Sequence, residues 1–575
     1  MASKDSKPHL TELSRHNDLP SDSELQETFD LRSKLRGDLL QVDTEIQRLN
    51  EKRAGIQKSI DTYNAILSPA RRLLPDVLRE IFYHCLPDGR NPPLSATKAP
   101  MVLTHVCSIW RAVALASPLI WARLHISLLG GPRSLSSAFG APLSSAAFAK
   151  RYQVLSKAME LRCLAVKVWL TRSGTCPLSI SLSYPMSFIE RVNNSLDDRE
   201  AYVLTEPLFQ QILSSSQRWK HVELSMPFYI YKILETFISG DTLPLLNSLR
   251  GNLPSNDIGP SNDIGLEDPD PVPVGFLEAP NLQRLSLNSP QLPMKTVMLL
   301  PIWGRLTDLR FQSTIIDVDF FNIIKVCHNL VTFQVDKLQV YWHSPYVPQT
   351  EVTIPTLQML RISESVGISH VVRAINAPNL KSLDYRFPPS IICANNLLAL
   401  VERGALTLRK LSLDLQNLRP EGTMTCLSLA NEVSHLVLRY TSPHASGPSN
   451  DLFNLDLLTI PNNSCPSASR EILLPKLEVL EMNGICQFTD EGILRLLRSR
   501  LDAARRGDIP PLRRLKLQFA RHRQQDIIEE ASELAKSAGF ELSLELDYPP
   551  DELRYNGRLS PSPNSAEEAW PPVVN

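Results

Sequence analysis

One short phrase, L-x-x-L-x-L, recurs along the C-terminal part of this 575-residue chain and constrains its fold more than any other feature. It appears as APNLQRLSL at 279–287, IPTLQMLRI at 354–362 and APNLKSLDY at 377–385, and again at 474–482 and 510–518. Successive copies lie roughly 23 to 28 residues apart. A unit of this length holds one strand and one return segment, and it cannot bury its own leucines. The pattern therefore predicts stacked units whose strands form one parallel sheet.

The phrase and its period resemble leucine-rich repeats. The segment CQFTDEGILRLL at 486–497 resembles the cysteine-containing subtype of that family. Elsewhere the signature asparagine or cysteine after the strand is mostly missing, so the repeats are degenerate. An irregular α/β domain is the alternative interpretation of residues 151–548.

A heptad of apolar residues predicts a long helix over residues 24–68. Ser68-Pro69 ends it, because proline lacks a backbone donor. Such a helix needs cover for one face, either from its own chain or from a second copy, giving a possible homodimer through residues 25–67. One position of the heptad holds Leu25, Leu39, Ile46, Ile60 and Leu67, the other holds Leu35, Val42, Leu49, Ile56 and Tyr63, and Thr28, Arg32 and Arg53 interrupt them.

Two apolar stretches follow, LLPDVLREIFYHCLP at 73–87 and VLTHVCSIWRAVALASPLIWARL at 102–124. Leu74, Leu78, Ile81 and Phe82 recur at the spacing of one helical stripe. A unit this small leaves apolar surface uncovered, which usually marks a partner site. The alternative is that the large C-terminal part covers it.

These stretches resemble the F-box, a small three-helix module, over residues 69–125. With the preceding helix, they resemble the expanded F-box family of mushroom-forming fungi (basidiomycetes). The resemblance implies docking on the Skp-type adaptor of a cullin–RING ubiquitin ligase. The implied adaptor contacts are Leu74, Pro75, Val77, Leu78, Ile81, Phe82, Leu86, Val106, Cys107, Trp110 and Trp121.

The expected fold class is therefore α/β. It comprises an N-terminal long helix, a small three-helix F-box and an irregular leucine-rich-repeat solenoid, with parallel strands and helices on the outer face. Composition predicts disordered ends at 1–23 and 549–575, a linker at 126–150, and a loop insertion at 251–275 that contains the duplicated hexapeptide PSNDIG.

Alternation along the repeat strands predicts which side chains face away from the leucine core. Solenoids of this kind bind ligands along the sheet face, so these residues are the candidate target-binding set. The set is Arg284, Arg361, Asp384, Arg386, Lys410, Asp414, Glu481, Arg514 and Lys516.

Composition and motifs exclude several classes of function. The net charge of −1 provides no field for nucleic acid, and no apolar run predicts a membrane span or a signal peptide. Nine scattered cysteines predict reduced, buried thiols in an intracellular protein of the cytoplasm or nucleus. No metal or cofactor motif occurs. His105 and Cys107 are expected to be core residues rather than a catalytic pair.

A run of ten Lys or Arg residues between Arg495 and Arg523 has two interpretations, a solvated helix face or a site for phosphate or an acidic peptide. For the whole protein, we expect a non-catalytic substrate receptor of a ubiquitin ligase with an unknown protein target. The alternatives are an interaction scaffold without a ligase role, in which the long helix forms a homodimer, and an enzyme, which no residue constellation supports.

Overall fold

The computed structural model describes residues 19–130, 145–185, 195–253, 274–288, 300–339, 347–366, 370–386, 395–415, 418, 420–439, 454–460, 472–486, 488–519 and 521–548. The chain divides into two compact units, residues 1–81 and 82–575. The expected insertion at 251–275 and the expected disordered ends lie mostly or wholly outside the described residues.

The first unit contains the long helix α2, Asp22–Leu67, which confirms the helix predicted from the heptad. A capping box opens it, because the side chain of Glu24 accepts a hydrogen bond of 2.8 Å from the backbone N–H of Ser21. Ser68 is extended, and the short 3-10 helix η1, Pro69–Arg72, follows. The ten apolar heptad side chains are 40–67% exposed.

Helix α3, Pro75–His84, begins with proline at its first position, where the missing N–H has no helical partner in any case. It is followed by η2, Val102–His105, by α4, Ser108–Leu115, and by η3, Pro118–Trp121. The sulfur of Cys107 accepts a 3.5 Å hydrogen bond from the backbone N–H of Trp110 and so caps α4.

The second unit is built on one open sheet of 14 strands among the described residues, all paired in parallel and ordered almost as they occur in the chain. Strands β8, Val352–Thr353, and β10, Ile375–Asn376, form a separate small ladder. The strands of the large sheet are β1 Arg123–Ser127, β2 Leu178–Ser183, β3 Trp219–Ser225, β4 Ser248–Asn252, β5 Arg284–Asn288, β6 Asp308–Ile316, β7 Thr332–Gln339, β9 Met359–Val366, β11 Ser382–Arg386, β12 Lys410–Asp414, β13 His435–Arg439, β14 Val479–Cys486, β15 Arg514–Phe519 and β16 Ser543–Asp547.

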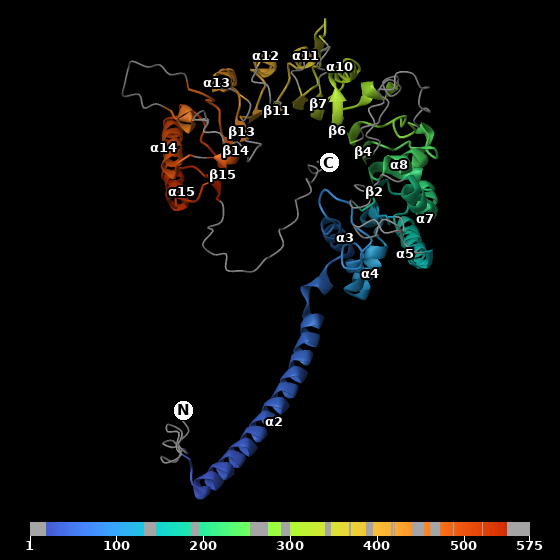
Figure 1. Ribbon diagram of the computed structural model, residues 1–575, viewed down its shortest axis with the longest axis vertical. Helices are drawn as coiled ribbons and strands as arrows, with labels where there is room; N and C mark the ends of the chain where they lie inside the picture. Colours follow the sequence, from blue (N-terminus) through green and yellow to red (C-terminus); the bar gives the residue numbers. More distant parts are fainter. Residues whose placement is uncertain are drawn as a thin grey trace. The chain divides into compact units, whose positions relative to one another are not determined.

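Helices return the chain between strands along the outer side of the curved sheet (Figure 1). Short 3-10 helices take this role in other units: η4 Ser216–Arg218, η5 Gly240–Thr242, η6 Pro301–Arg305 and η7 Leu455–Leu458. The helices are α5 Ser145–Arg172, α7 Ser195–Leu213, α8 Phe228–Glu235, α10 Asp317–Val326, α11 His370–Arg373, α12 Asn395–Gly404, α13 Pro420–Leu429, α14 Asp490–Arg506 and α15 Ile528–Ser537.

The recurring leucines align in register across the sheet. Leu360 pairs with Leu383, which lies opposite Leu411, which in turn lies opposite Leu436. All four are fully buried. Burying each such side chain stabilises the fold by about 1.5–3 kcal/mol. The expectation of an α/β chain with a long N-terminal helix and stacked parallel strands is thus confirmed.

Polar side chains just before several strands donate hydrogen bonds to the preceding strand-and-return repeat. The amide of Asn329 donates to the carbonyl of Gly304 at 2.7 Å, and the amide of Asn379 donates to that of Pro355 at 2.8 Å. Thr356 has the same role, donating to the carbonyl of Leu330 at 2.7 Å. These bonds satisfy turn carbonyls that the parallel ladder leaves free.

Two boundaries differ from those expected. Strand β1 spans the expected junction of module and linker at residue 125, because His125 and Ile126 pair with Ser181 and Leu182 of β2. Helix α5 already begins at Ser145, inside the expected linker, so the small residues there favour helix more than loop.

Candidate functional site

Helix α3 separates the expected adaptor contacts into an exposed and a buried set. Leu74 is 67% exposed, and Pro75 and Val77 are also exposed. Ile81 is half-buried. Leu78 and Phe82, by contrast, are fully buried.

The expectation that Leu78, Phe82 and Leu86 contact a partner is therefore corrected. All three side chains are withdrawn from solvent, so a partner cannot reach them in this conformation. Phe82 packs on Trp110 with 4.9 Å between ring centroids. Helical spacing identified the correct stripe but could not tell its core members from its exposed ones.

Helix α4 and the residues before it carry the second group of expected contacts. Val106 and Cys107 are exposed, and Trp110 is half-buried. Ile109 is also exposed but was not among the expected contacts. Ile109 lies in the first turn of α4, whereas Val106 precedes the extended residue Cys107 that begins the helix, so helical spacing from Val106 does not identify it.

Trp121 belongs to the core, which corrects its assignment as an adaptor contact. Its indole N–H donates to the carbonyl of Ala114 at 2.8 Å, and its ring meets that of Trp169 edge-on at 4.9 Å. The guanidinium of Arg172 lies 4.5 Å above it. Trp121 thus fastens η3 to α5.

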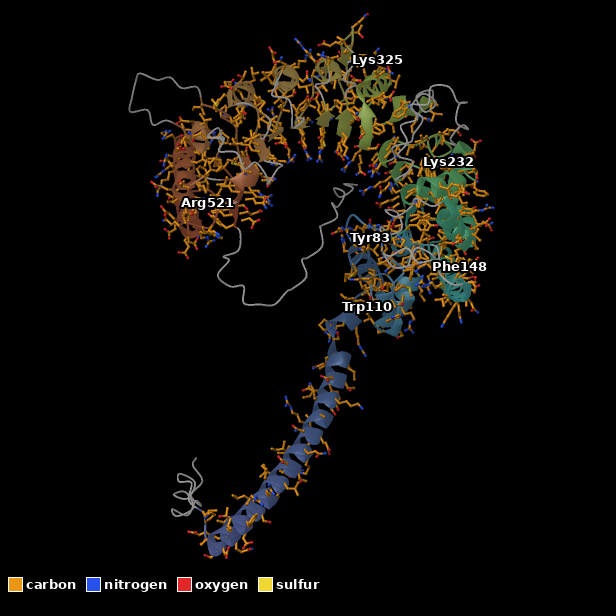
Figure 2. The ribbon with its side chains drawn as sticks, viewed as in Figure 1. Tyr83, Trp110, Phe148, Lys232, Lys325 and Arg521 are labelled. Carbon is orange, nitrogen blue, oxygen red and sulfur yellow. The ribbon has the colours of Figure 1, made fainter. Side chains whose placement is uncertain are left out.

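The open face of the sheet carries rows of polar side chains in strand register, on the side away from the helices (Figure 2). One row passes through Gln334, Arg361, Asp384 and Ser412 on consecutive strands of the sheet. Strand spacing brings such neighbours within about 5 Å. Residues separated by some 25 positions in sequence therefore form ion pairs.

The centre of this face is a group of six side chains that we call the sheet-face cluster. The guanidinium of Arg439 donates to both carboxylate oxygens of Asp384 at 2.9 Å. Arg361 lies 3.4 Å from Asp384 and 4.0 Å from Asp336, and Arg310 lies 3.3 Å from Asp336. The cluster is Arg310, Asp336, Arg361, Asp384, Arg386 and Arg439, with side chains 16–30% exposed.

Arg386 completes the cluster, with its Nε 3.8 Å from Asp384. Burial, with a contribution from neighbouring Arg361, lowers the pKa of Arg386 below its usual value. Its Nε is buried without a hydrogen-bond partner. Four guanidinium groups here meet two carboxylates, so the cluster retains capacity to donate hydrogen bonds.

The remaining expected target contacts are spread along the sheet. Arg284, Lys410 and Glu481 are half-buried on the open face, and the amide oxygen of Asn247 accepts a 3.2 Å hydrogen bond from Arg284. Arg514 and Lys516 both pair with Glu545 on β16, at 2.7 and 3.1 Å. Asp414 is corrected, because its side chain is buried and not available to a ligand.

Most residues of the basic run from Arg495 to Arg523 contact partners within the fold. Arg495 pairs with Asp456 at 3.2 Å, and Arg498 pairs with Glu530. Arg500 is fully buried and donates to three backbone carbonyls, those of Leu458, Leu473 and Leu474. These partners favour a structural role over a phosphate site.

Reactive groups do not converge in the described residues. Burial raises the pKa of the Cys327 and Cys426 thiols to about 12, which keeps them from acting as nucleophiles. His105 and Cys107 are both exposed, so the expectation that they lie in the core was wrong. Cys85 is exposed as well, so not all thiols are buried.

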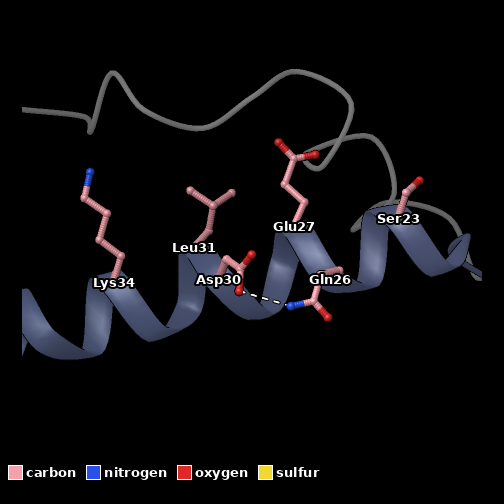
Figure 3. A pocket seen from close by; sticks show the side chains of 6 residues that line it. All are labelled: Ser23, Gln26, Glu27, Asp30, Leu31 and Lys34. Atoms are coloured by element: carbon pink, nitrogen blue, oxygen red, sulfur yellow. Dashed lines mark hydrogen bonds between the residues drawn. The ribbon is translucent and has the colours of Figure 1, made fainter.

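The parts of the chain that are described contain no group of three or more potential metal ligands. Within those same parts, no helix combines the length and apolarity needed to cross a bilayer. One shallow groove runs along the start of α2 and is lined by Ser23, Gln26, Glu27, Asp30, Leu31 and Lys34 (Figure 3). All six come from one helix face, and Gln26 donates to Asp30 at 3.2 Å, so the groove is solvated helix surface.

No family model matches the chain, and no curated protein is significantly similar to it.

Proposed function

We propose that this protein is a substrate receptor of a cullin–RING ubiquitin ligase, with an F-box at residues 69–125 and degenerate leucine-rich repeats after it. The protein performs no chemistry itself. It holds a target protein near a charged ubiquitin-conjugating enzyme and raises the effective concentration of the target's lysines.

The observation that carries the proposal is that apolar side chains are exposed in both of the stretches that resemble the F-box. Leu74, Pro75 and Val77 are exposed at the start of α3, and Val106 and Ile109 are exposed around α4. Apolar anchors of this kind dominate the binding energy of protein interfaces. A Skp-type adaptor is the partner that the resemblance implies.

For the target, we propose the open face of the sheet around the sheet-face cluster. Arg361 and Arg439 are held in fixed positions by Asp336 and Asp384, so little side-chain entropy is lost when a ligand binds. The excess of guanidinium groups favours a target segment with acidic side chains.

The adaptor half is tested with the double substitution Leu74→Ala and Pro75→Ala. We expect it to abolish co-purification with a recombinant Skp-type adaptor while leaving the unfolding transition unchanged, because both side chains are exposed. Leu406→Ala is the matched control, since Leu406 is 84% exposed in the turn that follows α12. Undiminished capture by the double variant would remove the proposal.

The target half is tested by affinity purification from native cells with mass spectrometry. Proteins retained by Leu74→Ala/Pro75→Ala but lost from Arg361→Gln/Arg439→Gln are the expected targets. If both variants retain the same proteins, the open face of the sheet does not bind the target. If no adaptor binds the unaltered protein, the scaffold alternative replaces the ligase.

A further inference from the structure

The longest uncovered apolar surface in the described residues is the heptad stripe of α2, which we call the seam. A helix of 46 residues is about 69 Å long. Its ten apolar seam residues are 40–67% exposed. We propose that α2 pairs with α2 of a second copy of this chain as an antiparallel coiled coil. This pairing is independent of the proposed ligase role.

A parallel, in-register pair is disfavoured by the charges in and beside the seam. It would set Arg32 against Arg32 and Arg53 against Arg53 in two core layers, because identical seam positions face each other in that arrangement. Beside the core, Asp38 would face Asp43 of the other copy on both flanks. Like charges in facing core or flanking positions repel each other, most strongly where water is excluded.

An antiparallel pair removes these conflicts. In such a pair, each core layer joins the first seam position of one helix to the second position of the other. With Ile46 against Leu49, Arg53 faces Val42 and Arg32 faces Tyr63. The arginine stems then pack on apolar partners while their heads reach water. The other layers join Leu39 to Ile56, Ile60 to Leu35, and Leu67 to Thr28.

The flanking residues select this register. In this register, Glu45 of each copy lies beside Lys52 of the other copy, so the dimer contains this attractive contact twice. Leu31 of each copy likewise lies beside Ile66 of the other. Glu45 also pairs with Arg48 of its own helix at 2.6 Å, so its carboxylate would be shared between two cations.

Antiparallel registers shifted by one heptad are less favourable, because they bring like charges together. A shift in one direction sets Glu45 against Glu45 and Asp43 against Asp43 of the other copy. A shift in the other direction sets Lys52 against Lys52 and shortens the overlap. The seam is therefore covered by α2 of a second copy, which runs antiparallel and sets its Leu49 against Ile46.

Sedimentation of the full chain tests the pairing. We expect twice the 64.5 kDa mass of one chain, falling to one chain in the variant Ile46→Asp/Leu49→Asp. The outward-facing change Glu51→Lys is the control and should leave the dimer intact. A monomer at all concentrations, or a dimer that survives Ile46→Asp/Leu49→Asp, overturns the proposal.

A charge swap tests the direction. Glu45→Lys and Lys52→Glu should each weaken the dimer roughly three- to tenfold, since each turns two attractive contacts into repulsive ones. The double swap should bind more tightly than either single variant, although the pair of Glu45 with Arg48 in each helix is not regained. Glu51→Lys and Lys58→Glu, on the outer face, provide the same charge changes as controls. A double swap no tighter than the single variants excludes the antiparallel register.

Discussion

At the scale of single residues, Asp490 shows how one buried charge fastens the C-terminal end of the sheet. Its carboxylate pairs with Arg521 and accepts hydrogen bonds of 2.9 Å from the backbone N–H groups of Gln524 and Gln525 and 2.8 Å from the hydroxyl of Tyr548. Burial alone raises the pKa of Asp490, but these hydrogen bonds outweigh it and hold the pKa at about 2.

We expect Asp490→Asn to lower the free energy of opening of this end by about 2 kcal/mol at neutral pH. Because the folded pKa of about 2 lies below the usual value of 3.8, the wild-type advantage is full above about pH 5. It disappears as the pH falls through 4 toward 2. The difference in opening free energy is measured by hydrogen exchange of the Gln524 and Gln525 amides in the wild type and in Asp490→Asn, compared at each pH.

The control is Asp508→Asn, which removes an exposed carboxylate paired with Arg506 and should change exchange little. An advantage that stayed constant from pH 6 to pH 2 would contradict the ionised, hydrogen-bonded state of Asp490.

At the scale of elements, η3 combines buried large side chains, Ile120 and Trp121, with one that is exposed, Leu119. Trp121 is buried between Ala114 and Trp169, whereas Leu119 is exposed. A helical turn with both kinds of residue can hold the fold together and still present surface to a partner.

Trp121→Ala should therefore destabilise the second unit by about 3–5 kcal/mol, through the cavity left beside Trp169 and the unsatisfied carbonyl of Ala114. Urea unfolding followed by tryptophan fluorescence measures the loss. Leu119→Ala, in the same turn, should shift the transition by less than about 0.5 kcal/mol. Equal effects of the two changes would contradict the burial of Trp121.

At the scale of the whole molecule, the buried leucine rows lie in the second unit, and α2 belongs to the first. The apolar side chains of the α2 seam are exposed, so they add little to the core of one chain.

We expect a chain that lacks residues 1–68 to unfold within about 2 °C of the full protein when both are monomeric, because no seam residue is buried. Sedimentation should find it as a monomer at concentrations where the full chain is a dimer. The measurements are differential scanning calorimetry at low concentration and sedimentation. A fall of about 5 °C or more would show that α2 covers part of the core.

The sequence by itself determined the periodic part of this protein. The spacing of leucines such as Leu360 and Leu383 predicted parallel strands, because period-two alternation and a repeat near 25 residues are local properties of the chain. The heptad from Leu25 to Leu67 predicted α2 for the same reason. Both patterns are complete within short windows of sequence.

Only the tertiary structure decided which members of a pattern are buried and which charges meet. Leu74 and Leu78 share a helical stripe, yet one is exposed and the other buried, because burial depends on distant segments. One guanidinium nitrogen of Arg439 donates to both carboxylate oxygens of Asp384 although 55 residues separate the two, because stacked strands bring them together. Neither outcome follows from local spacing, since the partner is chosen by packing across the sheet.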